Sequence, residues 1–171
     1  DDELKEFHLS RIQLLDDSNA DLFACETIPS SQEARVLSEI LIQTKKMAWL
    51  SFSCRDGQHL NDGTPIEECV ERLANHRNII AIGVNCTAPL HISSLITRIK
   101  EKSGEKKIII YPNSGEVYDA ESKTWSDSSD SMVFEDKNKE WLALGADIIG
   151  GCCRVRPDQI SILHKILLEA T

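Results

Sequence analysis

Five short apolar runs divide the chain into repeats of about 30 residues, and each run is followed by a polar cluster and an amphipathic stretch. The runs cover residues 21–25, 48–53, 79–85, 107–111 and 146–150. Their apolar residues are nearly continuous rather than alternating, which is typical of strands buried on both faces of a parallel sheet. The pattern therefore predicts an α/β protein in which strands and helices alternate.

The stretches between the runs carry helix signals. Apolar residues at helical spacing predict helices over residues 4–15, 30–46, 64–75 and 89–102, and a last one from residue 157. Pro65, Pro89 and Pro157 stand at or near the start of three of them, where proline fits best. Residues 116–130 are acidic and rich in serine, without apolar periodicity, and are expected to form a loop.

Two architectures fit such a repeat: a closed (β/α)8 barrel of the TIM type and an open doubly wound sheet. No Gly-x-Gly-x-x-Gly motif follows any run, which weakens the dinucleotide-binding form of the open sheet. Polar residues or cysteines follow the runs at their carboxyl ends, where barrels keep their active sites. The barrel is favoured. Because a full barrel needs about 250 residues, residues 1–171 are expected to form the C-terminal part of a single barrel domain, with about five strand-helix units.

Composition narrows the functional classes. The formal net charge of −9 argues against nucleic-acid binding, which needs a concentrated basic surface. No stretch approaches the 18 apolar residues of a membrane span, so no membrane role is expected. The chain starts without Met or a targeting leader, which indicates further residues upstream. The six cysteines mostly end apolar runs, as cytosolic thiols rather than secreted disulfides do, so a cytoplasmic location is expected.

Three of the cysteines predict a metal site. Cys86 ends the third run, and Cys152 and Cys153 follow the fifth. Strand ends two places apart in a barrel are about 10 Å apart, so their side chains can meet on one ion. Three thiolates and an open fourth position make a zinc site of the catalytic type, and Gly150 and Gly151 would let the backbone bend there. Buried cysteines that only pack are the alternative, and spacing alone leaves both open.

Four motifs in one order carry a family resemblance. They are DLFACETIP at residues 21–29, GVNC at 83–86, YPNSG at 111–115 and GGCC at 150–153. Together they resemble the zinc-dependent homocysteine S-methyltransferases, above all the plant-like enzymes that use S-methylmethionine or S-adenosylmethionine, and the resemblance covers essentially the whole chain. It implies one Zn²⁺ held by Cys86, Cys152 and Cys153, with the homocysteine thiol as the fourth ligand.

The resemblance also implies substrate-binding residues. Glu26 matches a glutamate that binds the amino group of homocysteine, although a carboxylate near a helix start is the simpler reading. Asn113 is placed to contact substrate or the vacant metal position, and a turn-forming Asn explains it equally well. The other cysteines are expected to pack in the core, and the histidines to lie at the surface or at edges. These residues are Cys25, Cys54 and Cys69, and His8, His59, His76, His91 and His164.

The predicted function is transfer of a methyl group from S-methylmethionine or S-adenosylmethionine to the homocysteine thiol, giving methionine. The partners are then small molecules, homocysteine and a sulfonium donor. One alternative is a truncated, non-catalytic zinc-binding fragment, because the glycine-rich first strand of the family, with its substrate-binding aspartate, has no counterpart here. The other is an aldolase-like barrel without metal, in which the cysteines belong to the core.

An incomplete barrel has structural consequences. Five units cannot close a barrel, so the strands at Asp21 and Ala146 should each have an open edge. Leu22, Phe52 and Ile109 are expected to face the barrel interior and to be more exposed than ordinary core residues. The isolated chain is expected to aggregate or pair its edges with another copy, and to lack methyltransferase activity.

Overall fold

A computed structural model describes residues 1–126 and 134–169. Its centre is a parallel sheet with the strand order β1-β2-β3-β4-β7. These strands are β1 (Leu22–Ile28), β2 (Met47–Phe52), β3 (Ile79–Asn85), β4 (Lys107–Tyr111) and β7 (Ile148–Ile149). A separate antiparallel hairpin consists of β5 (Val117–Asp119) and β6 (Thr124–Ser126). All five predicted strands are thus present, in sequence order across the sheet.

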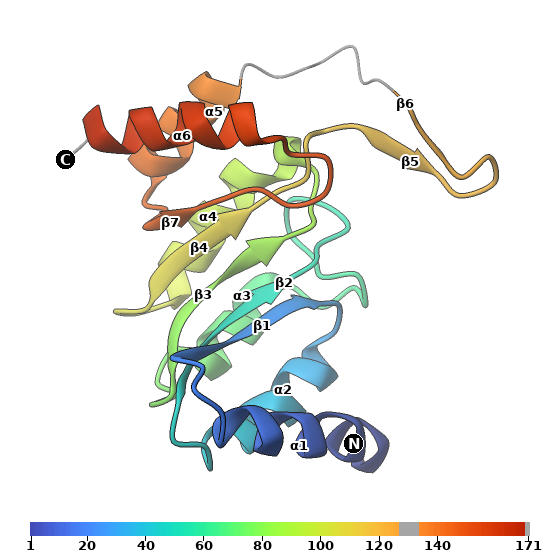
Figure 1. The fold of residues 1–171 in the computed structure, drawn as a ribbon, viewed down its shortest axis with the longest axis vertical. Coiled ribbons are helices and arrows are strands. Elements are labelled where there is room, and N and C mark those ends of the chain that lie inside the picture. Colours follow the sequence, from blue (N-terminus) through green and yellow to red (C-terminus); the bar gives the residue numbers. More distant parts are fainter. Residues whose placement is uncertain (127–133, 170–171) are drawn as a thin grey trace.

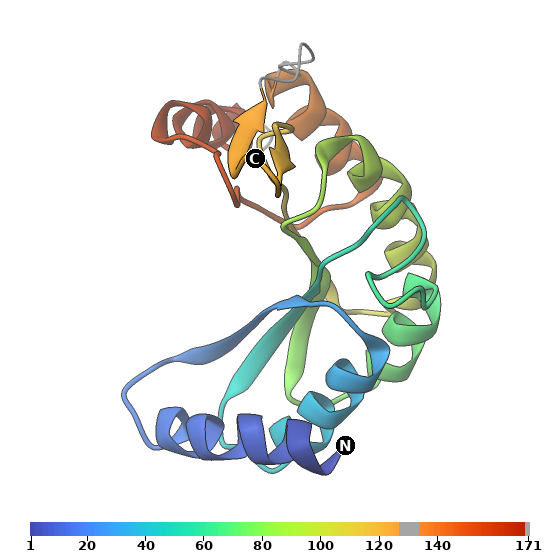
Figure 2. The ribbon, with the colours of Figure 1, turned by 90° about the vertical axis from the view of Figure 1, so that its right-hand side faces the viewer.

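Six helices are assigned within the described ranges. They are α1 (Asp2–Asp16), α2 (Ser31–Leu41), α3 (Ile66–Leu73), α4 (Pro89–Lys102), α5 (Phe134–Leu144) and α6 (Pro157–Glu169). Figure 1 shows the sheet with its helices, and Figure 2 shows the helices along the outside of an arc whose inner side is formed by the strands. No described helix is long and apolar enough to cross a membrane.

Helix α2 ends earlier than the sequence predicts. Ser30 caps its start, since Ser30 Oγ accepts a hydrogen bond from the Glu33 amide at 3.2 Å. At its end the Leu41 carbonyl accepts hydrogen bonds from Thr44 Oγ1 at 2.8 Å and from Asn78 Nδ2 at 2.7 Å. The Lys45 amide donates to Asp16 Oδ1 instead, at 3.0 Å, so the helical ladder stops at Leu41.

One hairpin and one helix were not predicted. Residues 116–130 were expected to be a loop, but they contain the β5–β6 hairpin in their described part. Helix α5 was missed because its sequence, FEDKNKEWLAL, is mostly polar. Its fully buried Trp141 joins the main core. A sequence signal existed: Gly145, with φ of 113°, follows the helix, and its amide bonds to the Trp141 carbonyl at 3.2 Å.

The main core lies between the sheet and the helices. Phe52 is one of its members and is 0 % exposed. Successive strand residues face opposite sides, and the Ser51 hydroxyl bonds to side chains on the inner side of the arc, so Phe52 faces the helices. The prediction that Phe52 faces an open interior was therefore wrong. Ile109 does lie on the inner side, beside Gly83 and Ile148, but only 4 % of it is exposed.

The predicted open edges are present. Strands β1 and β7 are the outermost strands of the parallel sheet in the described part of the chain. Leu22, at the start of β1, is partly exposed, as expected of an interior residue beside an open edge. The inner face of the sheet is thus partly covered by its own side chains and partly open.

One histidine differs from expectation. His8 was expected at the surface or an edge, yet it is only 6 % exposed, on α1 beside Glu33 of α2. Its Nε2 bonds to Glu33 Oε1 at 2.9 Å, and Arg11 donates to its Nδ1 at 3.0 Å. Because Arg11 can only donate, Nδ1 accepts and Nε2 carries the proton. His8 therefore joins α1 to α2 through a fixed tautomer.

Candidate metal centre

The three predicted ligands converge at the carboxyl end of the sheet. The sulfurs of Cys86, Cys152 and Cys153 all lie within 4.8 Å of one another. Cys86 Sγ is 3.8 Å from Cys153 Sγ, and Cys86 and Cys152 are paired as a disulfide with their Cα atoms 5.6 Å apart. The predicted convergence is confirmed, while the expectation that all six cysteines are free thiols does not hold for this pair. Cys152 is partly buried and Cys153 is exposed.

The segment that follows β4 holds these cysteines together. The Cys86 amide donates to the Tyr111 carbonyl at 3.3 Å, and the Cys152 amide donates to the Pro112 carbonyl at 2.8 Å. The Ser114 amide donates in turn to the Cys153 carbonyl at 3.0 Å. Residues 111–114 thus bond to both cysteine-bearing segments, which fixes their separation.

The two glycines before the cysteine pair act differently from the prediction. Neither Gly150 nor Gly151 has a positive φ, so neither supplies an unusual bend. A Cβ atom on Gly151 would instead overlap the side chain of Val155. The Val155 amide bonds to the Cys152 carbonyl at 3.1 Å, so a side chain at Gly151 would disturb the turn that carries Cys152.

The donor set fits zinc when Cys86 and Cys152 are reduced thiols. Tetrahedral Zn²⁺ with Zn–S bonds of about 2.3 Å separates its sulfurs by about 3.8 Å, and the Cys86 and Cys153 sulfurs are 3.8 Å apart. Asn113, between the two cysteine segments, has a buried Oδ1 without a hydrogen-bond partner among the described residues. A buried acceptor without a partner costs stability, so a bound group that donates to Asn113 would relieve that cost.

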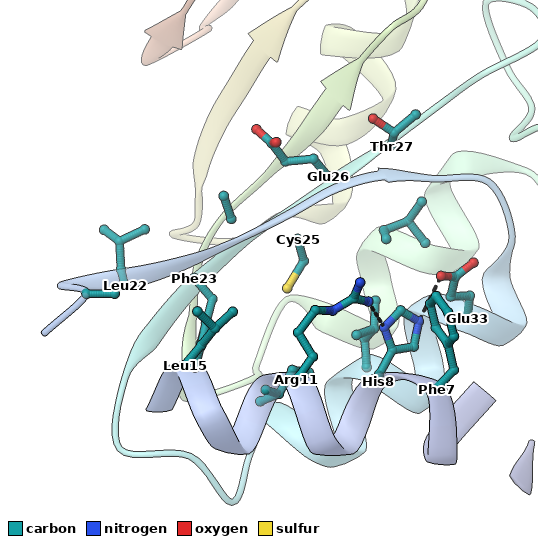
Figure 3. Close-up of a pocket in the computed structure, with 15 residues that line it drawn as sticks. Phe7, His8, Arg11, Leu15, Leu22, Phe23, Cys25, Glu26, Thr27 and Glu33 are labelled. Carbon is teal, nitrogen blue, oxygen red and sulfur yellow. Dashed lines mark hydrogen bonds and ion pairs between the residues drawn. The ribbon is translucent and has the colours of Figure 1, made fainter. Parts of the chain in front are cut away.

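Glu26 lies near the end of β1, on the side away from α1. Figure 3 shows its carboxylate pointing opposite to the Cys25 side chain, which points towards α1. Burial raises the pKa of Tyr111 to about 12, and the negative charge of Glu26 adds to the rise. The Glu26 carboxylate therefore interacts electrostatically with Tyr111. Tyr111 ends β4, and its carbonyl accepts a hydrogen bond from the Cys86 amide.

The remaining cysteines pack as predicted. Cys54 and Cys69 are buried and Cys25 is half-buried. Burial raises the pKa of Cys25 to about 11 and the pKa values of Cys54 and Cys69 to about 12. They stay protonated at neutral pH, which makes them poor metal ligands.

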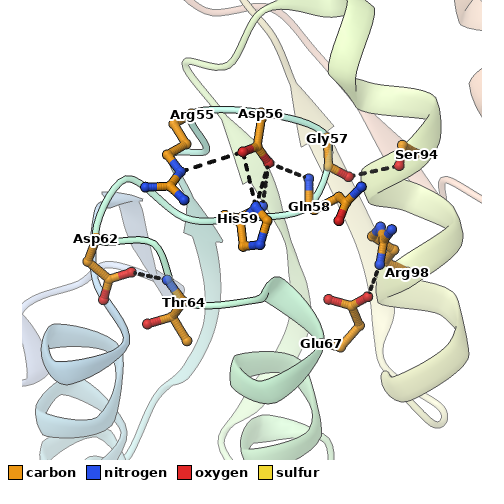
Figure 4. A network of polar contacts seen from close by, with 10 residues as sticks. All are labelled: Arg55, Asp56, Gly57, Gln58, His59, Asp62, Thr64, Glu67, Ser94 and Arg98. Carbon is orange, nitrogen blue, oxygen red and sulfur yellow. Dashed lines mark hydrogen bonds and ion pairs between the residues drawn. The ribbon is translucent and has the colours of Figure 1, made fainter.

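The loop after β2 is a network of turns rather than a second reactive site. Asp56 accepts hydrogen bonds from the amides of Gln58 and His59, both at 2.7 Å, and Figure 4 shows Arg55 beside it. Desolvation favours a higher pKa for Asp56, but these bonds and the His59 ring outweigh it and hold the pKa below its usual value. Asp62 caps a second turn by accepting from the Thr64 amide at 2.8 Å. Side-chain carboxylates thus hold the turns of this loop.

A cavity of about 470 Å³ lies between α1 and β1; Cys25 lines it, whereas Cys86, Cys152 and Cys153 do not. Figure 3 shows Phe7, His8 and Arg11 of α1 on one side of it and residues of β1 on the other. The hydrogen bonds of His8 are made to Glu33 and Arg11 within the cavity wall. This cavity borders the open edge of the sheet and carries no part of the cysteine cluster.

Sequence reasoning missed the polar residues beneath the cysteines. Ser51, Asn85 and Tyr111 form one hydrogen-bonded group on the inner face of the sheet. Asn85 is almost fully buried. The signal was available, because Asn85 is a polar residue at the end of an apolar strand, directly before a predicted ligand.

Comparison with known proteins gives one consistent result. The family model described as homocysteine S-methyltransferase matches residues 1–167. Homocysteine S-methyltransferase YbgG of Bacillus subtilis is 46% identical over 161 residues, which are 94% of this chain and 51% of that protein. Homocysteine S-methyltransferase 2 of Arabidopsis thaliana is 39% identical over 98% of this chain and 51% of its own length.

A solved structure agrees with these relatives. The metallated form of the homocysteine methyltransferase MmuM from Escherichia coli superimposes with a TM-score of 0.79 at 34% identity, covering 96% of this chain and 51% of that chain. The parallel five-stranded sheet thus matches a TIM-barrel methyltransferase. The chain spans about half the length of the curated relatives it matches. With a family model matched over nearly its whole length, the chain belongs to the homocysteine S-methyltransferase family.

Proposed function

We propose that residues 1–171 form the C-terminal part of a methyltransferase barrel that moves a methyl group from S-methylmethionine or S-adenosylmethionine to the homocysteine thiol, yielding methionine. The observation that carries the proposal is the convergence of the Cys86, Cys152 and Cys153 sulfurs at the carboxyl end of the sheet. That is where a barrel presents its chemistry. A cytoplasmic location, expected from the cysteine usage, stays a prediction.

The chemistry needs a thiolate. A free thiol has a pKa of about 8.5 and is mostly protonated at neutral pH. Bound Zn²⁺ would deprotonate the substrate thiol and keep it nucleophilic. Cys86, Cys152 and Cys153 would hold the ion, which requires Cys86 and Cys152 to be reduced. The formal net charge of −9 favours the approach of a cationic sulfonium donor.

Two residues would bind substrate. The Glu26 carboxylate, on the inner side of β1, is proposed to bind the amino group of homocysteine. Asn113 is proposed to contact substrate beside the metal, a role supported by its buried, unpaired Oδ1. An ammonium group can donate to a carboxylate and to an amide oxygen, so both residues suit an amino-acid substrate.

The proposed role of Glu26 can be measured. Glu26→Gln should weaken homocysteine binding by about 1.5–3 kcal/mol, the contribution of a hydrogen bond to a charged group. Homocysteine binding is followed through the spectrum of the Co²⁺-loaded protein, and metal content should not change. Glu101→Gln, a substitution at an exposed glutamate of α4, is the matched control. Equal homocysteine affinity in the two variants would mean that Glu26 does not bind the substrate and is only a carboxylate near the start of the following helix.

The function is tested on the chain itself and on a longer polypeptide that supplies the strands before β1. Both are purified under reducing conditions, analysed for zinc and assayed for methionine formation from homocysteine and each sulfonium donor. We expect both to bind about one zinc and only the longer polypeptide to turn over. Absence of zinc from both would refute the proposal, and turnover by the 171-residue chain alone would refute its description as an incomplete barrel.

A further inference from the structure

A chain of hydrogen bonds crosses the inner face of the sheet and ends on one side chain. Trp49 Nε1 donates to the Tyr111 hydroxyl at 3.1 Å. The Tyr111 hydroxyl lies 2.5 Å from Ser51 Oγ, and Ser51 Oγ donates to Asn85 Oδ1 at 2.8 Å. Because the one hydroxyl proton of Ser51 goes to Asn85, the Tyr111 hydroxyl is the donor to Ser51. Every donor in the series thus points towards Asn85.

The Asn85 amide also binds β1, and its orientation is unambiguous. Its Oδ1 accepts from the backbone amide of Thr27 at 2.8 Å, and its Nδ2 donates to Thr27 Oγ1 at 2.7 Å. A backbone N–H can only donate, so the atom that faces it must be the oxygen. Both lone pairs of Oδ1 are then used, one by Thr27 and one by Ser51. The side chain is 2 % exposed and joins three neighbouring strands.

Asn85 acts where the backbone departs from a regular strand. The pairing of β1 with β2 shifts register between Cys25 and Ile28, and Thr27 has a φ of 60°. A β-branched residue is strained in this left-handed region. The Thr27 amide donates to Asn85, so the side chain of Asn85 stabilises the irregularity. Glu26 is the residue directly before it, and its direction depends on that bend.

The same residue adjoins the first cysteine. Cys86 directly follows Asn85 and has a φ of 46°, also in the left-handed region. The Asn85 carbonyl accepts from Thr87 Oγ1 at 3.0 Å, so both sides of Cys86 are fixed. Rotation of the Asn85 side chain out of its site would release the bend at Thr27 and remove the side-chain anchor of the residue that directly precedes Cys86.

We infer that Asn85 is a positioning residue that sets the Cys86 thiol and the Glu26 carboxylate together, so that metal binding and recognition of the substrate amino group depend on one amide. The inference rests on the proposed function and deepens it. If Asn85 only packed in the core, its loss would lower stability alone. A positioning role predicts that loss of Asn85 also weakens both metal and homocysteine binding, beyond its effect on folding. Outer partners of metal ligands typically contribute 10–100-fold to affinity.

The chain offers a matched control at the other end of the same strand. Asn78 immediately precedes β3 and is 8 % exposed. Its Nδ2 donates to the carbonyls of Leu41 at 2.7 Å and Thr44 at 2.9 Å. Asn78→Ala and Asn85→Ala each remove a buried, hydrogen-bonded amide from an end of β3. Only the second removal touches the residues beside Cys86 and Glu26.

The experiment uses the full chain, reduced, with Co²⁺ as the metal probe and homocysteine as the second probe. Thiolate-to-cobalt absorption gives the metal affinity, and its change on adding homocysteine gives the substrate affinity. Asn85→Ala should weaken Co²⁺ binding by about 10-fold or more and homocysteine binding by a similar factor. Asn78→Ala, at a comparable loss of thermal stability, should change each affinity by less than about two-fold.

A rescue variant separates positioning from packing. Glycine adopts the left-handed conformation without strain, so Thr27→Gly in the Asn85→Ala background should recover homocysteine affinity at least about three-fold. If Asn85→Ala does not fold, Thr27→Val removes only the Oγ1 that accepts from Asn85 and should weaken homocysteine binding about three-fold. Equal losses in Asn85→Ala and Asn78→Ala, or no loss in either, would overturn the inference. A wild-type chain without thiolate-to-cobalt absorption would instead overturn the proposed function.

Discussion

Replacing Cys86 with serine should lower zinc affinity by more than about 100-fold and, in the longer polypeptide that supplies the strands before β1, reduce methyl transfer to background. Loss of a residue that merely supports a ligand costs 10–100-fold in metal affinity, so loss of a ligand itself exceeds that range. Serine has nearly the size of cysteine but is a poor zinc ligand at neutral pH. The Cys152 and Cys153 sulfurs alone would leave two ligand positions open, and the homocysteine thiol could no longer complete a set of four.

Competition with a chromophoric chelator measures the zinc affinity of the reduced protein. Cys25→Ser is the control, because Cys25 lies in the same sheet but on the side that faces α1. It removes one thiol without touching the cluster. Zinc affinity lowered equally by both substitutions would mean that the metal depends on the fold and not on the Cys86 sulfur, and the ligand assignment would fall.

The position of the cysteine cluster was predictable because it follows from topology. Parallel strands place their carboxyl ends at one edge, so Cys86 and Cys152 meet although 66 residues separate them. Side chains alternate between the two faces of a strand. Because Ser51 faces the inner side of the sheet, the same alternation would have placed Phe52 against the helices. Such features depend on the order of residues along one strand.

Other features depend on contacts across strands and were not predictable. The burial of His8 arises from its pairing with Glu33, a residue on another helix. The role of Asn85 depends on the direction of its side chain towards Thr27, 58 residues away. The sequence shows that a polar residue such as Asn85 is unusual in an apolar strand. The residues that it contacts depend on how the neighbouring strands are aligned, which the sequence does not show. The β1–β2 irregularity that turns Thr27 inward is itself a departure from regular pairing.

At Gly83 the inner face of the sheet has no room for a side chain. Gly83 lies in β3 opposite Ser51 of β2 and Ile109 of β4. A Cβ atom there would overlap the Ile109 carbonyl oxygen and lie 2.6 Å from the carbonyl carbon. These atoms are backbone in a paired strand, so they cannot move aside without opening the β3–β4 ladder. Because Gly83 has no side chain, the backbone of β4 and the side chain of Ile109 can approach it this closely.

Gly83→Ala should therefore lower the free energy of unfolding by about 3 kcal/mol or more, at the upper end for an overpacked site and a large share of the 5–15 kcal/mol typical of a domain. Urea unfolding followed by circular dichroism measures it. Gly150→Ala is the control, since its Cβ would meet only Tyr111 Cβ at 3.4 Å, an ordinary contact. Because Asn85 and Cys86 follow Gly83 in the chain, Co²⁺ affinity should fall along with stability in Gly83→Ala and stay unchanged in Gly150→Ala. Equal unfolding midpoints for the two variants would contradict the close approach of β3 and β4 at this position.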